Sequence, residues 1–307
     1  MKAARSVRST SPGPRGPRPA EEISSRDNQW LKGFRSALAG AESPDGTIGI
    51  EGPHLVEAAL SAQLKVAAVL ISTSGERHLE ALRPLLPVGT RILRTSDRLF
   101  ETVSATDAPQ GIAALAHPRE WSFEDLSLAA TPLIVVLAGV QDPGNVGAIL
   151  RAAEGLGASG VATCAARGIG TANPLAPKAL RASAGSALRF PLLRGVQSAA
   201  LLLELRMAGV RIYAACPSEA PSRPASPDSK DALPPLRRPW EIQWQGPSSL
   251  WIGNEGAGLP LDIIRSADAR VTIPQAAARP DALESLNAAA AASILLYEAA
   301  RQRTNLA

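Results

Sequence analysis

The chain alternates, along most of its length, between short apolar runs typical of buried strands and segments whose hydrophobic residues have helical spacing. Such alternation is typical of α/β domains, in which helices cover a central sheet. It extends over residues 26–117 and again over residues 132–307. A chain of 307 residues is also long enough for two domains of ordinary size. The sequence therefore predicts two α/β domains, the second with a doubly wound parallel sheet.

Three segments carry little of this pattern. Residues 1–25 include a basic, proline-rich stretch, and we expect them to form a disordered tail. Residues 118–131 indicate a linker between the two domains. Residues 217–240 are rich in proline, serine and charged side chains, which favours a solvent-exposed loop.

The net positive charge is concentrated in the tail. The whole chain has a formal net charge of +4, but residues 1–20 contain five basic residues and no acidic residue. The remainder carries 27 basic against 28 acidic residues, so it is not a generic binder of polyanions. Any contact of the folded part with a nucleic acid must therefore depend on a few placed side chains.

Composition also disfavours several functional classes. Cys164 and Cys216 end apolar stretches, which favours buried core positions, and two cysteines cannot supply a disulfide framework. The three histidines are dispersed, so we expect no metal site. No apolar run reaches the ~18 residues of a membrane span, and the N-terminus lacks the apolar region of a secretory signal. We therefore expect a cytoplasmic protein with no membrane partner.

Three loops of the second domain follow predicted strands at their carboxyl ends, where open α/β sheets bind ligands. In the first loop, QDPGNVGAILR, Asn145 is a candidate N-cap of the following helix. Arg151 lies above Gly147 and Ala148 on that helix, and these small residues would leave space for a bulky ligand. A capped helix with a solvent-facing arginine explains the same residues without any function.

The second loop, GNEGAGLP, places Glu255 among three glycines. It matches neither nucleotide-binding glycine motif, and its carboxylate would repel phosphate groups. An ordinary strand-to-helix turn is the alternative. The third loop leads from Ile-Pro at 273–274 to Ser-Leu-Asn at 285–287, where Asn287 would cap the terminal helix. The alanines at 288–292 make that helix slender, which core packing alone also explains.

In this order, the three loops resemble the motifs of the SpoU/TrmH family of RNA ribose 2′-O-methyltransferases, within the SPOUT class. The matching stretches are 145–151 (NVGAILR), 252–259 (IGNEGAGL), and 273–274 with 285–287. The first domain is similar to the ribosomal-protein-like RNA-binding domain of many rRNA-directed members, through Asn28 with Lys32, GIEGPHLVEAAL and PQGIAAL. The sequence departs from the family pattern in two places. The segment before Ser285 is longer, and Gln275 stands where the family commonly has methionine.

The resemblance implies an S-adenosylmethionine-dependent enzyme that methylates RNA, with rRNA favoured over tRNA because the first domain is present. It further implies a deep trefoil knot in the second domain and a homodimer. Arg151 would be the catalytic arginine, either as a base assisted by an RNA phosphate or as an electrostatic clamp. The other candidate catalytic residues, which would orient Arg151, the ribose or the cofactor, are Asn145, Glu255, Ser285 and Asn287.

The remaining candidate site residues fall into two groups. The resemblance implies that backbone groups of Gly253, Ile273 and Leu286 bind the cofactor. We expect RNA contacts from Asn28, Lys32, Lys178 and Arg181.

Other functions fit parts of the pattern. A non-catalytic RNA-binding or assembly factor could retain the same fold. An unrelated nucleotide-using α/β enzyme is disfavoured because the glycine fingerprint and the lysine of the nucleotide motifs are missing. A tRNA-directed enzyme and a specialised antibiotic-resistance methylase both remain open within the main hypothesis.

Overall fold

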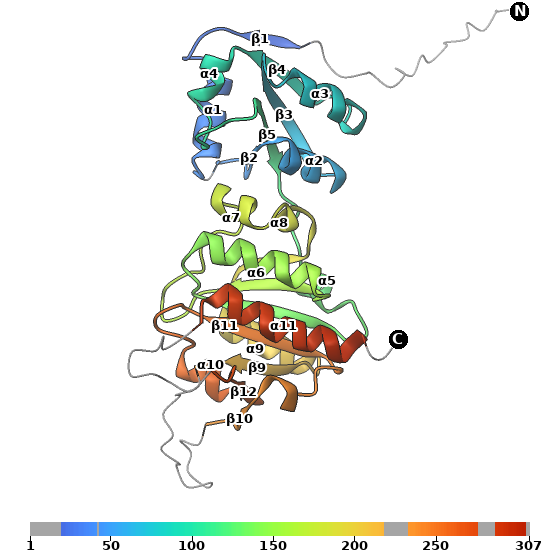
Figure 1. The fold of residues 1–307 in the computed structure, drawn as a ribbon, viewed down its shortest axis with the longest axis vertical. Helices are drawn as coiled ribbons and strands as arrows, with labels where there is room; N and C mark the ends of the chain where they lie inside the picture. Colours follow the sequence, from blue (N-terminus) through green and yellow to red (C-terminus); the bar gives the residue numbers. More distant parts are fainter. Residues whose placement is uncertain (1–19, 42, 218–232, 276–285, 305–307) are drawn as a thin grey trace, which may run out of the picture. The chain divides into compact units, whose positions relative to one another are not determined.

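The computed structural model describes residues 20–41, 43–217, 233–275 and 286–304, and it divides the chain into two compact units between Pro118 and Arg119 (Figure 1). We refer to these as the first and the second unit. Within the described ranges, no helix is both long enough and apolar enough to cross a membrane.

The first unit contains a mixed five-stranded sheet in the order β1-β4-β3-β5-β2. Its parallel part is β1, β4 and β3, and the antiparallel pairs are β3 with β5 and β5 with β2. The strands are β1 (Glu21–Ile23), β2 (Ile48–Glu51), β3 (Lys65–Ser72), β4 (Arg91–Thr95) and β5 (Ile112–His117). The helices are α1 (Gln29–Leu38), α2 (Pro53–Ser61), α3 (Glu76–Leu82), η1 (Arg83–Leu85) and α4 (Asp97–Glu101).

Strand β1 shortens the predicted N-terminal tail. The sequence predicts disorder up to residue 25, but Glu21–Ile23 pair in parallel with β4. Ile23 is buried in the core of the first unit, and its carbonyl accepts a hydrogen bond from Thr95 Oγ1 at 3.0 Å. The prediction for these residues is wrong because pairing with a distant strand edge leaves no signal in local composition. Residues 1–19 lie outside the described ranges.

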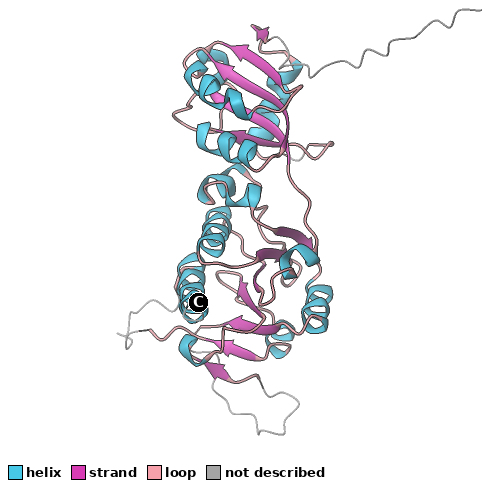
Figure 2. Cartoon of the chain, turned by 90° about the vertical axis from the view of Figure 1, so that its right-hand side faces the viewer, coloured by secondary structure: helices cyan, strands magenta, loops and turns pink. Residues whose placement is uncertain are grey.

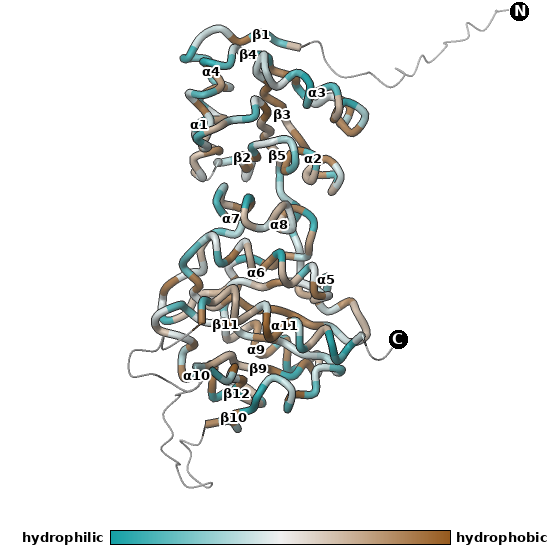
Figure 3. The backbone as a smooth tube through the Cα atoms, in the orientation of Figure 1, coloured by the Kyte–Doolittle hydropathy of each residue, from teal (hydrophilic) through white to brown (hydrophobic). Residues whose placement is uncertain are grey.

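The second unit contains a seven-stranded sheet in the order β10-β12-β9-β11-β6-β7-β8, and every neighbouring pair is parallel. The predicted parallel sheet is thereby confirmed. Its central strands β6 and β11 are buried along nearly their whole length, and Figure 3 shows the hydrophobic character of β11. The strands are β6 (Leu133–Ala138), β7 (Gly160–Cys164), β8 (Leu192–Val196), β9 (Arg211–Ala215), β10 (Leu236–Arg237), β11 (Ser248–Gly253) and β12 (Ala269–Val271).

Helices cover both faces of this sheet, as Figure 2 shows for the second unit. On one face, Leu126, Leu201 and Ile263 from three helices share a core with Val136 and Trp251 of the central strands. The helices α6 and α11 pack against each other, and α11 also contacts β11. The helices are α5 (Phe123–Ser127), α6 (Pro143–Gly155), α7 (Pro177–Ala182), α8 (Ser186–Arg189), α9 (Ser198–Met207), η2 (Pro239–Glu241), α10 (Leu261–Arg265) and α11 (Ala288–Thr304).

The segment that the sequence indicates as a linker, residues 118–131, contains helix α5. Ser122 and Asp125 form a capping box at its start. Leu126 is fully buried in the core described above. From Arg119 on, the segment therefore belongs to the second unit, anchored by Leu126, which differs from the predicted free connection.

Arg303 joins the C-terminal helix to the loops that precede β6 and β11. Its guanidinium donates to the carbonyl oxygens of Thr131 at 2.7 Å, Trp244 at 2.7 Å and Gly246 at 2.8 Å.

Hydrogen bonds to charged groups contribute about 1.5–3 kcal/mol, so we expect Arg303→Met to lower the free energy of unfolding of the second unit by about 2 kcal/mol in urea denaturation. Arg301→Met removes a pair with Glu298 in which the arginine is half-exposed, and it should lower stability by less than Arg303→Met. Equal effects of the two substitutions would contradict this role of Arg303.

Candidate functional site

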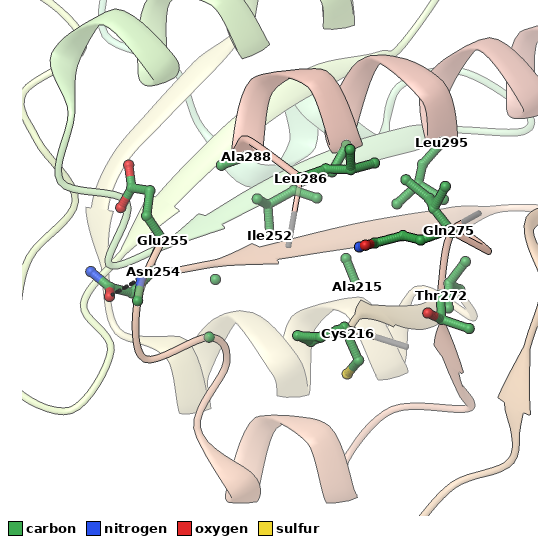
Figure 4. A pocket seen from close by; sticks show the side chains of 17 residues that line it. Ala215, Cys216, Ile252, Asn254, Glu255, Thr272, Gln275, Leu286, Ala288 and Leu295 are labelled. Carbon is green, nitrogen blue, oxygen red and sulfur yellow. Dashed lines mark hydrogen bonds between the residues drawn. The ribbon is translucent and has the colours of Figure 1, made fainter. Parts of the chain in front are cut away.

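A cavity of about 440 Å³ lies at the carboxyl ends of β9, β11 and β12 in the second unit (Figure 4). The loop after β11, the residues after β12 and the first turns of α11 complete its lining. Because these strands are parallel neighbours, their carboxyl ends meet at one edge of the sheet. The position of the cavity is therefore a consequence of the sheet topology.

The cavity brings together the three residues that the resemblance implies for cofactor binding, Gly253, Ile273 and Leu286. Gly253 allows the chain to fold back immediately after β11. A Cβ atom at this position would lie 2.4 Å from both the carbonyl carbon of Gly258 and the amide nitrogen of Leu259. Only glycine fits such a close approach of two backbone segments.

Other lining residues were missed by the sequence reasoning. Ala215 ends β9 and Cys216 follows it, and Ala288 and Ala291 lie on the face of α11 that borders the cavity. The apolar run that ends at Cys216 predicts a strand, but its place beside β11 depends on the strand order, which no local pattern reveals. The alanines at the start of α11 thus line the cavity as well as packing in the core.

The two cysteines have different surroundings. Cys164 is buried in the core of the second unit, as predicted, and burial raises its pKa to about 12. Cys216 is only half-buried and lines the cavity, although burial raises its pKa to about 11. Within the described ranges there is no group of three or more histidine, cysteine or acidic side chains that could hold a metal ion.

The carboxylate of Glu255 binds the beginning of helix α6. Its Oε2 atom accepts from the Gln141 amide at 3.0 Å, and Oε1 accepts from the Asp142 amide at 3.2 Å. Oε1 also accepts from Asn145 Nδ2 at 3.0 Å. An anion is stabilised at this position because the amide of the N-cap residue Asp142 has no partner within the helix and lies at its positive dipole end.

Asn145 continues this chain of hydrogen bonds to the third loop. Its Oδ1 atom accepts from Asn287 Nδ2 at 2.9 Å. The Oδ1 atom of Asn287 accepts from the amides of Ala289 and Ala290, so Asn287 caps α11 as predicted. Three loops that are far apart in the sequence therefore meet through Glu255, Asn145 and Asn287. Ser285, the remaining candidate in these loops, lies outside the described residues.

Asn145 is not the N-cap of α6, and that prediction is wrong. The cap is Asp142, whose side chain accepts from the Gly144 amide, and Pro143 occupies the first helical position. Proline favours that position because its backbone angle is already helical and it lacks an N–H group. The helix consequently starts before Asn145, whose side chain is left to bridge Glu255 and Asn287.

Arg151 is exposed on α6 and makes no hydrogen bond or ion pair with any residue that the structure describes. The space predicted above Gly147 is filled by α7. A Cβ atom on Gly147 would lie 2.3 Å from the carbonyl oxygen of Ala179 and 2.9 Å from the amide nitrogen of Ser183. Gly147 therefore permits two helices to pack closely, and its interpretation as room for a ligand is wrong.

The four residues expected to contact RNA are divided between the units. In the first unit, Asn28 caps α1 by accepting from the Trp30 amide at 2.8 Å, and Lys32 lies 3.5 Å from the Asp27 carboxylate. In the second unit, Lys178 is exposed and paired with Asp142 at 3.0 Å, whereas Arg181 is exposed at the end of α7. Their binding of RNA stays a prediction.

The sequence matches known families over most of its length. Residues 132–297 match the SpoU rRNA Methylase family, and residues 43–114 match an MRM3-like substrate binding domain. The 23S rRNA (guanosine(2553)-2′-O)-methyltransferase RlmP of Bacillus subtilis (strain 168) is 30% identical over 280 residues, covering 90% of this chain and 98% of that protein. The 23S rRNA (guanosine-2′-O-)-methyltransferase RlmB of Xylella fastidiosa (strain 9a5c) is 27% identical, covering 91% of this chain and 98% of that protein.

Solved structures agree with these matches. The AdoMet-bound rRNA methyltransferase from Sinorhizobium meliloti superimposes with a TM-score of 0.74 at 28% identity, covering 92% of this chain and 98% of that chain. The parallel sheet covered by helices makes the second unit an α/β domain, and its cavity lies at the edge where such domains bind ligands. Within that class, the chain belongs to the SpoU rRNA methylase family, which confirms the resemblance read from the three loops.

The carboxylate of Glu255 should give the second unit a defined pH dependence. Burial raises its pKa, but the hydrogen bonds from Gln141, Asn145 and Asp142 outweigh burial and lower the pKa below its ordinary 4.5. A carboxyl group with a lowered folded pKa stabilises the protein above its unfolded pKa, and this contribution is lost as the pH falls through the folded pKa.

We therefore expect Glu255→Gln to reduce the free energy of unfolding at pH 7, and the difference from wild type to shrink as the pH falls below about 4.5. Urea denaturation across this pH range measures both effects. Glu204→Gln, on the exposed surface of α9 in the same unit, is the matched control. A difference between wild type and Glu255→Gln that is independent of pH would show that the charge of Glu255 is not what anchors α6.

Gly147→Ala tests the packing of α6 on α7. The added Cβ would overlap the backbone of Ala179 and Ser183, and overpacking of this kind costs about 1–3 kcal/mol of unfolding free energy. Gly155→Ala, at the end of the same helix, meets no atom within 4 Å and should leave stability unchanged or slightly raised. Full stability of Gly147→Ala in urea denaturation would argue against close packing at this position.

Proposed function

We propose that this chain transfers the methyl group of S-adenosylmethionine to a ribose 2′-hydroxyl of RNA, with rRNA as the substrate. The observation that carries the proposal is the hydrogen-bonded chain of Glu255, Asn145 and Asn287 beside a cavity lined by Gly253, Ile273 and Leu286. The names of the relatives support the reaction and the substrate class, because RlmP and RlmB are both 23S rRNA 2′-O-methyltransferases.

The cavity fits S-adenosylmethionine in size and in chemistry. Apolar residues such as Ile252, Val271 and Leu295 supply surface for a purine ring, and the folded-back loop at Gly253 exposes backbone groups to the cavity. The buried Oγ1 atom of Thr272 has no hydrogen-bond partner in the described part of the chain. When bound, the cofactor supplies a methyl group already activated on a sulfonium, and Gly253, Ile273 and Leu286 would hold it.

We assign Arg151 to positioning and to electrostatic stabilisation of the ribose oxygen. A guanidinium group is a poor base but a strong donor to phosphate and to a developing alkoxide. Arg151 has no competing ion pair among the described residues. Asn145 and Glu255 fix the first turn of the helix that carries it. Ser285 would act with Asn287 in orienting the ribose or the cofactor.

The proposal includes a trefoil knot in the second unit and a homodimer. Support for the knot is that β9, β11, β12 and α11, which are separated along the chain, enclose one cavity. Support for the dimer is that α11 exposes Ile294 and Tyr297, three residues apart on the same helix, with 43% and 61% of their surface accessible. Large apolar side chains grouped on a surface indicate a protein contact.

The first unit is proposed to bind the RNA, and its match to a substrate binding domain supports this. Lys32 and Asn28 would contribute there, and Lys178 and Arg181 would contribute on the second unit. The organisation proposed is a basic tail, an RNA-binding domain, a short connection that includes α5, and a methyltransferase domain acting in the cytoplasm.

Arg151→Ala tests the assignment. We expect the purified wild-type chain to transfer label from S-adenosylmethionine to rRNA taken from cells that lack the gene. Arg151→Ala should lower the rate by about 100-fold or more, because it removes a charged donor to the reacting group, while cofactor affinity measured by calorimetry stays unchanged. Arg194→Ala, which removes an exposed arginine from β8, is the matched control and should keep the wild-type rate.

Two outcomes contradict parts of the proposal. Full activity of Arg151→Ala would remove Arg151 from the reaction. Cofactor binding without transfer to any RNA by the wild type would favour an RNA-binding factor that has lost turnover.

A further inference from the structure

Two polar side chains follow β12 at the side of the cavity opposite Glu255 and Asn254. Thr272 and Gln275 both line the cavity, and Figure 4 shows the Gln275 side chain running into it with its amide group foremost. Gln275 makes no hydrogen bond with the described residues. Thr272 is only 8% exposed, and its buried Oγ1 atom has no hydrogen-bond partner among the described residues. The Gln275 amide is therefore available to a ligand on this side of the cavity, and the Thr272 hydroxyl, which water does not reach, has no partner until a ligand supplies one.

The surroundings of these two side chains decide which part of a cofactor fits them. Ala215 and Leu295 make this side apolar, and Glu255 is the one side chain in the described lining that is charged at neutral pH. A carboxylate or an ammonium group placed beside Thr272 would lose water without gaining a charged partner, which is strongly unfavourable. A neutral, flat base with polar edges meets no such cost. Of the parts of S-adenosylmethionine, the adenine therefore fits here better than the charged amino-acid portion.

We propose that Gln275 reads the edge of the adenine ring of the cofactor, with the Thr272 hydroxyl as a second polar contact to the same base. This inference rests on the proposed function. A carboxamide can accept from the N6 amino group of adenine and donate to N7, the pairing by which glutamine and asparagine recognise adenine in nucleic acids. Hypoxanthine carries an oxygen in place of the N6 amino group, so the carboxamide cannot make both bonds to it.

Gln275, which replaces the methionine common in the family, would thereby determine the specificity for the base. Methionine, which the family commonly has where this chain has Gln275, can pack against a base but cannot form the paired hydrogen bonds. This chain should therefore discriminate between adenine and hypoxanthine through a side chain, in addition to any backbone contacts around Gly253, Ile273 and Leu286.

Calorimetry with two product analogues tests this role without depending on turnover. The probes are S-adenosylhomocysteine and S-inosylhomocysteine, titrated into the full chain. We expect the wild type to bind the adenosine compound at least about tenfold more tightly, as a bidentate contact provides. Gln275→Met should lose most of this preference. Thr272→Val should weaken binding of the adenosine compound, and Thr272→Ser should restore it. Gln197→Met, at an exposed glutamine outside the cavity, is the matched control.

The outcomes separate the inference from the proposed function. If the wild type and Gln275→Met show the same ratio of the two dissociation constants, Gln275 does not read the base and the inference is overturned. If the wild type binds S-adenosylhomocysteine but Thr272→Val binds it equally well, the hydroxyl contact is overturned. If the wild type binds neither compound nor S-adenosylmethionine, the proposed function falls and the inference falls with it.

Discussion

Glu255 connects the loop after β11 with the first turn of α6 through bonds to two backbone amides and to Asn145. The ionised carboxylate satisfies amides that the helix itself cannot, at the end of the helix where a negative charge is favoured. Asn145 in turn accepts from Asn287, which caps α11. A single charged group thus fixes the starts of two helices relative to a strand end. The cavity and the orientation of α6 both depend on that arrangement.

The order of the strands explains why these groups meet at all. Strand β11 lies between β6 and β9, although β7, β8, β9 and β10 come between β6 and β11 in the sequence. The loop after β11 is therefore brought beside the loop after β6, and Asn254 Nδ2 donates to the Gly139 carbonyl at 2.9 Å across this contact. The cavity lies on the other side of β11 from β6, at the carboxyl ends of β9, β11 and β12, and this is the edge at which open α/β sheets generally bind ligands. The position of the cavity thus follows from topology, and its chemistry follows from the loops.

Features that depend on local sequence could be predicted, whereas features that depend on strand order or on the packing of distant helices could not. The parallel sheet and the cap at Asn287 could be predicted, because strand–helix alternation and capping are local signals. The cap at Asn145 was wrong because the competing pair Asp142-Pro143 lies three residues earlier and starts the helix first. Gly147 was misread because a helical glycine looks the same whether a ligand or another helix packs against it. The pairing of β1 with β4, and the position of the predicted strand β9 beside β11, were missed because strand neighbours cannot be read from spacing.

The distribution of ion pairs shows how a nearly neutral body can present a selective positive charge. Lys178 is paired with Asp142, and Arg189 is paired with Glu154 through contacts of 3.0 and 2.6 Å. Binding a phosphate through either would compete with an existing partner. Arg151 has no such partner within the described ranges, so it would engage a phosphate without first breaking an ion pair. On the proposed function, selectivity for RNA therefore depends less on net charge than on which arginine is left unpaired beside an anchored helix.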